Sequence, residues 1–425
     1  MERPLTQHIR PNGSPLSLAE YEKAGGYRSL RKALAIPPQD IVTMVKASNL
    51  RGRGGAGFPT GMKWGLAPPV SSAPQPRYFI VNADEMEPGV FKDRLLLEGD
   101  PHQMIEGIIM SAYAVQAEKA YIFLRREYFL AEKRLNKAIA EAHEKNYLGA
   151  NILGSGFSLD LRIHSSAGRY ICGEETALIN ALEGRRAVPR AKPPFPLVCG
   201  LWGRPTVVNN VETVANIPHI VSNGPDWFKS LSTSNDSGTK IYGVSGRVNK
   251  PGAWELPMGT TIGELIEDHG GGMQKGYALR GIIPGGASTD FLLPEHLGVP
   301  MDFDSVAKAG SRMGTGTMTV LDDRTCAVGF VHNIEVFFAR ESCGWCTPCR
   351  EGLPWIVKIL NALENGQGER EDLAILEQQC RLLGPGNTFC AFAPGAVEPL
   401  QSALKYFRED FERHIREKKC PWKIP

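Results

Sequence analysis

YFIVNA (78–83), HQMIEGIIMSAYAVQA (102–117) and KAYIFLR (119–125) follow one another in the first third of the chain and identify its fold class. The outer two pieces are short apolar runs of strand length, and the middle piece has the apolar spacing of a helix. A strand, a helix and a strand in this order form a β-α-β unit, which favours a parallel sheet. An amphipathic helix at 131–146 and a strand at 159–166 continue the alternation, so we predict an α/β domain.

The remaining segments predict two further domains. A helix is expected at 177–184, and the Pro- and Gly-rich stretch 188–205 is expected to be an extended loop without regular structure. Composition shifts near STSNDSG (232–238), after which short strands and one helix (261–271) indicate a small α+β module. From Cys326 the pattern is helical to the end, and four helices suggest a bundle.

Bulk properties exclude several classes of protein. The 425 residues carry a net charge of +2 without a basic block, so nothing indicates a nucleic-acid partner. No stretch approaches the eighteen apolar residues of a transmembrane helix, and the first ten residues do not resemble a secretory signal. Nine cysteines in such a chain indicate a reducing compartment, where thiols are core residues, metal ligands or redox groups.

The segment ESCGWCTPCREG (341–352) places three cysteines three residues apart, at Cys343, Cys346 and Cys349. Thiols at this spacing cannot all face one side of a helix, so we predict a loop that wraps the N-terminus of the helix beginning near residue 353. The positive end of a helix suits an anionic thiolate cluster. A compact triple with a distant fourth cysteine favours a [4Fe–4S] cluster, and the alternatives are structural zinc or no metal.

Cys390 is our choice for the fourth ligand, because it follows the turn-rich loop GPGNTF. Cys380 shares one helical face with leucines three, four and seven residues away and is expected in the core. The other four cysteines are weaker candidates, each better explained as a buried or incidental thiol: Cys172, Cys199, Cys326 and Cys420.

RGRGGAGFPTGMKW (51–64) matches G-x-G-x-x-G, but it does not follow a strand and open a helix, so the classical dinucleotide fingerprint fails. Its glycines still permit close approach to a flat or phosphorylated ligand, and the alternative is a mobile surface loop. NADEMEPGVFKDR (82–94) begins where a predicted strand ends, a usual ligand position in α/β sheets. Asp84, Glu85 and Glu87 could bind ribose hydroxyls, but a run of carboxylates is equally consistent with a solvated face. The acidic residues that open CGEETALINALEG (172–184) are likewise consistent with simple partners of a helix dipole.

These stretches, with SAGRYICGEETALINALEG, VVNNVETVANIP and SCGWCTPCREG, occur in the same order in the family of flavoprotein (F) subunits of proton-pumping NADH:quinone oxidoreductase, respiratory complex I. The resemblance covers nearly the whole chain. It implies a Rossmann-like domain for FMN and NADH (residues 1–238), a ubiquitin-like β-grasp module (239–325) and a four-helix bundle with a [4Fe–4S] cluster (326–425).

The resemblance also implies the site residues. FMN would contact Gly52, Arg53, Gly54, Lys63, Asn82, Asp84, Glu85, Gly173, Glu174, Glu175, Asn209, Asn210 and Thr213. NADH would contact Gly54, Gly55, Ala56, Gly57, Phe58, Lys63, Glu87, Glu175, Lys192 and Phe195. The cluster ligands would be Cys343, Cys346, Cys349 and Cys390. Family members often have an aromatic residue shortly after the Lys–Trp pair, where this chain has Leu66.

By the same resemblance, the chain would oxidise NADH by hydride transfer to FMN and pass single electrons to the cluster and on toward quinone. No side chain need act as a catalytic acid or base, and Glu174 and Glu175 would position the nicotinamide and tune the flavin. The implied partners are a thioredoxin-like [2Fe–2S] E subunit and the other complex I subunits. The implied location is cytoplasmic, peripheral on the inner face of the membrane.

Two other functions remain open at this point. A diaphorase subunit of an NAD-linked hydrogenase or formate dehydrogenase would share the chemistry and differ in where electrons go. A zinc-stabilised interaction protein without cofactors belongs to another class altogether.

Overall fold

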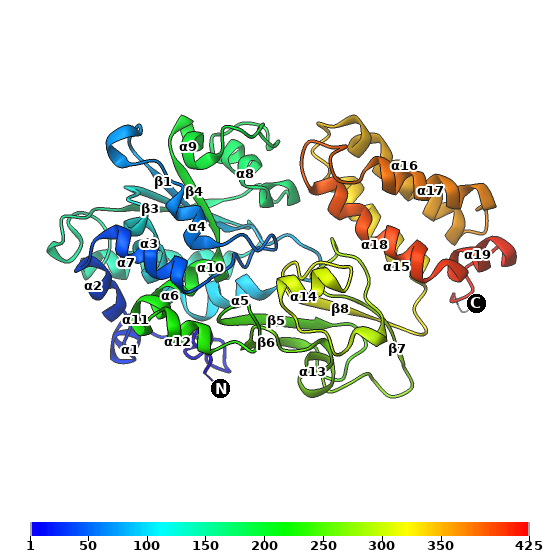
Figure 1. The fold of residues 1–425 in the computed structure, drawn as a ribbon, viewed down its shortest axis with the longest axis horizontal. Helices are drawn as coiled ribbons and strands as arrows, with labels where there is room; N and C mark the ends of the chain where they lie inside the picture. The colour runs from blue at the N-terminus through cyan, green and yellow to red at the C-terminus, as the bar shows by residue number, and fades with distance from the viewer. Residues whose placement is uncertain (1, 424–425) are drawn as a thin grey trace. The chain divides into compact units, whose positions relative to one another are not determined.

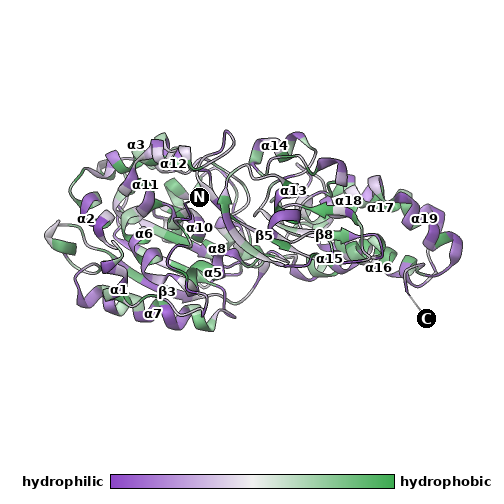
Figure 2. Ribbon diagram, turned by 90° about the horizontal axis from the view of Figure 1, so that it is seen from below, coloured by the Kyte–Doolittle hydropathy of each residue, from purple (hydrophilic) through white to green (hydrophobic). Residues whose placement is uncertain are grey.

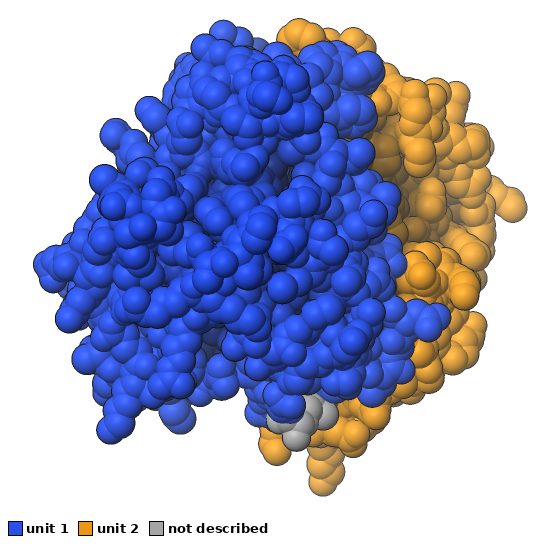
Figure 3. Space-filling model, turned by 60° about the vertical axis from the view of Figure 1, so that its left-hand side comes forward, with its two compact units in different colours: residues 1–86, 91–241, 254–260 blue, residues 87–90, 242–253, 261–425 orange. Residues whose placement is uncertain are grey.

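The computed structural model describes residues 2–423, and Figure 1 shows the fold. The chain divides into two compact units, which Figure 3 colours separately. The first unit extends to Met86 and includes Phe91–Ile241 and Trp254–Thr260. The second contains Glu87–Val90, Tyr242–Ala253 and the chain from Thr261 onward. The predicted boundary at 238 thus lies close to a change of unit, whereas the one at 325 lies inside the second unit.

A four-stranded parallel sheet forms the centre of the first unit. Its strands are β1 (Tyr78–Ala83), β2 (Lys119–Leu124), β3 (Asp160–Ser165) and β4 (Thr206–Asn210), in the order β3-β2-β1-β4. All three neighbouring pairs are parallel. The predicted parallel α/β fold is therefore confirmed, although strand β4 was not predicted.

The two connecting helices bury the strands that they join. Helix α6 (Pro101–Ala114) packs against β1 and β2, and α7 (Phe129–Glu144) packs against β3. The side chain of Asp100 accepts a hydrogen bond from the backbone N–H of Gln103 and so caps α6. Figure 2 shows α7 as a mixture of hydrophilic and hydrophobic residues, as expected for an amphipathic helix with one buried side.

Shorter helices complete the first unit: α1 (Leu18–Lys23), α2 (Arg28–Leu34), α3 (Pro38–Ala47), α4 (Thr60–Gly65), α5 (Lys92–Gly99), α8 (Glu175–Leu182), α9 (Pro196–Cys199), α10 (Val211–Ala215), α11 (Ile217–Asn223) and α12 (Pro225–Ser230). The prediction that 188–205 lacks regular structure is wrong at α9. Proline suits the first position of a helix, and the carbonyl of Phe195 accepts from the N–H groups of Val198 and Cys199.

A second sheet is mixed and has the order β6-β5-β8-β7; β7 and β8 belong to the second unit, whereas β5 and β6 are divided between the two units. Its strands are β5 (Thr239–Ser245), β6 (Gly252–Pro257), β7 (Leu279–Ile283) and β8 (Thr317–Asp322). Strands β5 and β8 pair in parallel, and β7 and β8 pair antiparallel. The helix expected at 261–271 consists of α13 (Ile262–Glu264) and a π-helical turn over Leu265–His269, and α14 (Phe303–Lys308) follows later.

Five helices form the C-terminal part: α15 (Ala327–Glu341), α16 (Thr347–Glu364), α17 (Arg370–Leu382), α18 (Phe392–Tyr406) and α19 (Arg408–Glu417). The single helix predicted at the end of the chain is therefore two helices, α18 and α19, which are separated at Phe407. Polar contacts join this part to the sheet, since the backbone N–H of Phe291 donates to the Ser402 hydroxyl and Arg280 donates to Asp410, both at 2.8 Å. None of these helices, nor any other between residues 2 and 423, has both the length and the hydropathy that crossing a membrane requires.

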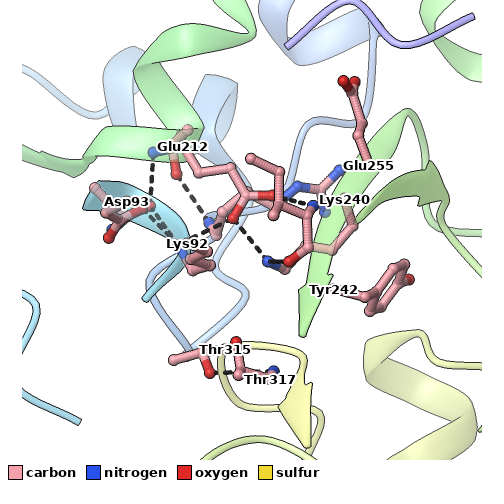
Figure 4. Close-up of polar contacts among 12 residues, drawn as sticks. Lys92, Asp93, Glu212, Lys240, Tyr242, Glu255, Thr315 and Thr317 are labelled. Atoms are coloured by element: carbon pink, nitrogen blue, oxygen red, sulfur yellow. Dashed lines mark hydrogen bonds and ion pairs between the residues drawn. The ribbon is translucent and has the colours of Figure 1, made fainter. Parts of the chain in front are cut away.

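A buried ionic cluster fixes the end of β4 within the first unit. The carboxylate of Glu212, at the start of α10, lies 2.7 Å from the Lys240 ammonium and 2.9 Å from the Lys92 ammonium (Figure 4). It also accepts from the backbone N–H of Ile241. Burial alone would raise the pKa of Glu212, but Lys240 and Lys92 outweigh it and hold the pKa at about 2.

Replacing Glu212 with alanine should destabilise the chain strongly, because it leaves two buried ammonium groups without their shared carboxylate. The expected loss is about 3–5 kcal/mol in free energy of unfolding at neutral pH, measured by urea unfolding followed by circular dichroism. The folded pKa lies below the ordinary value of 4.5, so the contribution of Glu212 is full above that pH and declines as the pH falls toward 2.

Asp160→Ala is the matched control, because Asp160 pairs with Arg162 at the surface. Its expected cost is within about 1 kcal/mol. Equal unfolding midpoints for the two variants would contradict a structural role for Glu212.

Candidate functional site

A cavity of about 830 Å³ lies in the first unit, where the carboxyl ends of β1 and β4 meet. These strands pair with Val81 beside Asn209 and Asn82 beside Asn210. From β1, the next strands β2 and β3 are added on one side of the sheet and β4 on the other, so the strand order reverses between β1 and β4. Parallel α/β sheets bind ligands at such switch points. The cavity is lined by Gly52, Gly54, Ala56, Gly57, Phe58, Lys63, Leu66, Asn82, Gly173, Glu175, Lys192, Phe195, Pro196, Leu197, Val198, Val208, Asn209, Asn210 and Thr213.

The glycine-rich segment forms one wall as a closed loop. It follows helix α3 rather than a strand, so the departure from the dinucleotide fingerprint is confirmed. The loop closes on itself because the backbone N–H of Gly52 donates to the carbonyl of Phe58 at 2.9 Å. A β-carbon added to Gly54 would lie 3.1 Å from that of Asn210, so glycine permits the loop to approach the end of β4.

A carboxylate held between two lysines is the main charged feature of the cavity. One oxygen of Glu175 lies 2.9 Å from the Lys63 ammonium, and the other lies 2.9 Å from the Lys192 ammonium. Burial would raise the pKa of Glu175, but the two cations outweigh it and lower the pKa. The carboxylate is therefore ionised at neutral pH, and the two ammonium groups beside it are donors that suit a phosphorylated ligand.

Polar side chains at the strand ends are anchored by neighbouring groups. The side-chain amide of Asn82 donates to the backbone carbonyl of Gly173, and the side-chain amide oxygen of Asn209 accepts from the indole N–H of Trp64. The Thr213 hydroxyl accepts from the backbone N–H of Arg53. These bonds fix the positions of the side chains before any ligand arrives.

Several residues predicted for FMN lie behind the wall of the cavity. The guanidinium of Arg53 is fully buried and donates to the carbonyls of Ser237 and Thr239. Asp84 is buried and accepts from the hydroxyl of Ser166. Their contact with FMN stays a prediction, and the structure shows both side chains bonded to the protein.

The predicted acidic residues serve largely as helix partners. The carboxylate of Glu85 is buried and accepts from the backbone N–H groups of Asp93 and Arg94 at the start of α5. Burial raises the pKa of Glu85. Glu174 caps α8 by accepting from the backbone N–H groups of Thr176 and Ala177, and it also lies 3.0 Å from the Lys192 ammonium.

Two residues predicted for NADH do not line the cavity. Gly55 sits in the glycine loop with φ +120°, a conformation that favours glycine. Glu87 belongs to the second unit, where its carboxylate accepts from the backbone N–H of Ser288 at 2.7 Å.

Four apolar residues of the lining were not predicted from the sequence. Val208 comes from β4, and Pro196, Leu197 and Val198 come from α9. A valine pair in TVVNN was the available signal for β4, whereas the four residues of α9 are too few to show a helical period. Leu66 lines the cavity with 63% of its surface exposed, so the position expected to hold an aromatic residue does face the site.

The cysteine motif lies at the start of α16 in the second unit. Cys346 is the N-cap residue and Cys349 lies in the first turn, so the loop predicted for the whole motif ends at Cys346. The reason is Pro348, which suits the first turn of a helix. Burial, together with the neighbouring Cys343 and Cys346, raises the pKa of the Cys349 thiol to about 11.

The loop that carries Cys390 reaches this motif. The backbone N–H of Phe389, one residue before Cys390, donates to the sulfur of Cys346 at 3.2 Å. Cys380 is buried on α17, as expected for a core residue. Three thiols at a helix N-terminus with a fourth arriving on a loop suit a thiolate-bound cluster.

Profiles of three known families match the chain. The family described as Nuo51 FMN-binding domain matches residues 45–219, and the SLBB domain matches residues 241–291. The NADH-ubiquinone oxidoreductase-F iron-sulfur binding region matches residues 329–414. These ranges contain the cavity, most of the small mixed sheet and the cysteine motif respectively.

Relatives that match nearly the whole chain belong to the same family as these profiles. The chain is 58% identical to the F subunit of NADH-quinone oxidoreductase from Salmonella typhimurium and to that from Escherichia coli, over 97% of this chain and 93% of each relative. A solved crystal structure of NAD⁺-reducing [NiFe]-hydrogenase in the H₂-reduced state aligns with a TM-score of 0.83 at 35% identity. That alignment covers 96% of this chain and 67% of the hydrogenase chain.

The fold and site define an FMN-binding, iron–sulfur component of an oxidoreductase. Gly173 borders the cavity, and a β-carbon added to it would have no protein atom within 4 Å. A larger side chain at this position would therefore extend into the space that a flavin would occupy, and glycine leaves that space open. The chain belongs to the family of F subunits of NADH-quinone oxidoreductase. Its cofactors are FMN and a [4Fe–4S] cluster.

Gly173→Leu should lower the amount of bound flavin per chain severalfold, because the new side chain enters the cavity without striking the protein. Flavin content is read from the visible absorbance of the purified protein. Gly65→Leu is the control, since an added β-carbon there also meets nothing within 4 Å and Gly65 does not line the cavity. Full flavin in Gly173→Leu would contradict placement of FMN in this cavity.

Proposed function

We propose that the chain is the NADH-oxidising subunit of a respiratory NADH:quinone oxidoreductase, complex I. The observation that carries the proposal is that most residues predicted for FMN and NADH, drawn from distant segments, line one cavity. When bound, FMN accepts two electrons from NADH and releases them singly to an iron–sulfur cluster. The chain supplies the binding groups and their orientation.

Charge and stacking account for how the cavity would hold its ligands. Lys63 and Lys192 place two ammonium groups beside the cavity, where they would attract phosphates. The rings of Phe58 and Phe195 border the same cavity with half of their surface exposed and offer flat faces for the adenine. The polar ends of β1 and β4 would face the flavin through Asn82, Asn209 and Asn210.

Glu175 would position the nicotinamide and tune the flavin. Its carboxylate is the negative charge between the two lysines, so it limits the positive field that the flavin experiences. Glu174 supports this arrangement by its contact with Lys192 and by capping α8. Neither residue is assigned a proton-transfer step.

The four predicted thiols would bind the cubane cluster at the start of α16, where exposed N–H groups and the helix dipole favour thiolates. The proposed ligands are Cys343, Cys346, Cys349 and Cys390. Electrons would leave toward a thioredoxin-like [2Fe–2S] E subunit and the other complex I subunits. The chain would lie on the cytoplasmic face of the membrane within that assembly, with the small mixed sheet acting as a scaffold.

The second function to consider is the diaphorase component of an NAD-linked hydrogenase, because a hydrogenase chain shares the fold. Identity favours complex I, at 58% against 35%. Purification of the native assembly through this chain, followed by mass spectrometry, separates the two functions. Complex I subunits are expected, and a [NiFe] catalytic subunit in their place would overturn the choice.

Glu175→Gln should change the reaction without expelling FMN. Loss of the negative charge between Lys63 and Lys192 is expected to raise the flavin midpoint potential and to change the KM for NADH by about tenfold, equivalent to about 1.4 kcal/mol. Potentiometry and steady-state oxidation of NADH with ferricyanide measure the two effects. Glu144→Gln, an exposed carboxylate on α7, is the control. An unchanged KM together with an unchanged potential would refute this role.

A further inference from the structure

A second group of metal-ligating side chains lies in the C-terminal helices, outside the cysteine motif and unused by the proposed function. It consists of Cys326, Glu364, His414 and Cys420. One ligand atom from each residue can be chosen so that all four lie within 4.8 Å of one another. All four belong to the second unit, and the sequence by itself assigns neither cysteine a role.

Separate segments of the chain supply these side chains. Cys326 is the N-cap residue of α15, and Glu364 is the last residue of α16. His414 lies in α19, and Cys420 follows that helix. The convergence of four segments on one point distinguishes this group from carboxylates and thiols that happen to be sequence neighbours.

The spacing of the ligand atoms suits one small ion. The Cys326 sulfur lies 3.1 Å from a Glu364 oxygen and 3.4 Å from Nε2 of His414, and that nitrogen lies 3.1 Å from the same oxygen. With bonds of about 2.3 Å to sulfur and about 2.0–2.1 Å to nitrogen and oxygen, a tetrahedral zinc site has edges of roughly 3.3–3.8 Å. The atoms of Cys326, Glu364 and His414 are therefore within a few tenths of an ångström of these edges, and the Cys420 sulfur lies within 4.8 Å of them and would move closer on binding.

The surroundings orient the ligands and exclude water. Nδ1 of His414 lies 2.6 Å from the carbonyl of Asp410, which leaves Nε2 directed at the group. The His414 side chain is fully buried, and the ring of Trp422 stacks on it. The second oxygen of Glu364 lies 3.1 Å from the Lys423 ammonium. A closed site with an oriented histidine is typical of structural rather than catalytic metal.

We propose that Cys326, Glu364, His414 and Cys420 bind one Zn²⁺ ion, which fastens the segment after α19 to the ends of α15 and α16. Two thiolates, one imidazole and one carboxylate make a four-coordinate set that favours zinc over magnesium or calcium, which prefer oxygen ligands. Binding would release the two thiol protons to solvent. Two thiolates and a carboxylate around Zn²⁺ leave one negative charge, which the Lys423 ammonium offsets.

This site is separate from the proposed iron–sulfur site. Cys346 caps the first turn of α16 and Glu364 ends that helix of 18 residues. At about 1.5 Å per residue, the two ends are roughly 27 Å apart. Two cysteines are also too few for a cluster held by four thiolates, so the two sites should lose metal independently.

Metal analysis of purified full-length variants tests this independence. The chain is expressed with zinc and iron, purified without chelator, and assayed by inductively coupled plasma mass spectrometry. Wild type and Cys380→Ser, a buried cysteine outside both sites, should each contain about one zinc per chain. Cys420→Ala should lose most zinc and keep its iron and flavin, whereas Cys390→Ala should lose iron and keep zinc.

X-ray absorption at the zinc edge tests the ligands in the wild-type protein, whether or not a variant folds. The proposal predicts two sulfur ligands at about 2.3 Å and two nitrogen or oxygen ligands at about 2.0–2.1 Å. A shell of four sulfurs, indicating zinc in the cysteine motif, would overturn it. Absence of zinc from wild type, or a Cys326–Cys420 disulfide in the native protein by mass spectrometry, would overturn it equally.

Discussion

The carboxylate of Glu212, buried between the Lys92 and Lys240 ammonium groups, is the constraint on which the proposed flavin site depends. A buried charge is stable only when it is paired, so this carboxylate ties the start of α10 to α5 and to the beginning of β5. The residue two before it, Asn210, ends β4 and donates to Asp93 at 2.6 Å. The end of β4 is thereby fixed in the place where it borders the cavity.

Both proposed cofactor sites use the ends of regular elements. In the first unit, the carboxyl ends of two parallel strands present amides to the cavity, and the glycine loop closes over them. In the second unit, the N-terminus of α16 presents the cysteine motif. A strand end or helix end offers side chains and backbone groups held by the element behind it, which is what a cofactor with fixed geometry requires. The charged group of Glu175, Lys63 and Lys192 adds electrostatic control to the first of these sites.

The sequence predicted the features that local patterns encode, and missed those that depend on tertiary contacts. Strong apolar runs identified β1 and β2, and leucines at helical spacing placed Cys380 in the core; the choice of Cys390 as the fourth ligand stays a prediction. Strand β4, with five residues, and helix α9, with four, are too short to show a periodic spacing of apolar residues, although both contribute to the lining of the cavity. Arg53 and Glu85 lie in the expected segments, yet long-range hydrogen bonds direct their side chains into the protein. Cys326 and Cys420 are 94 positions apart in the numbering, so only the fold brings them together.

The most direct test of the account is an anaerobic titration of the purified chain with NADH, followed by visible absorbance and low-temperature electron paramagnetic resonance. We expect NADH to bleach a bound flavin and to produce the signal of a reduced [4Fe–4S] cluster. Flavin that is bleached without such a signal would contradict electron transfer to the cysteine motif. A protein that binds no flavin after reconstitution with FMN would contradict the account at the cavity itself.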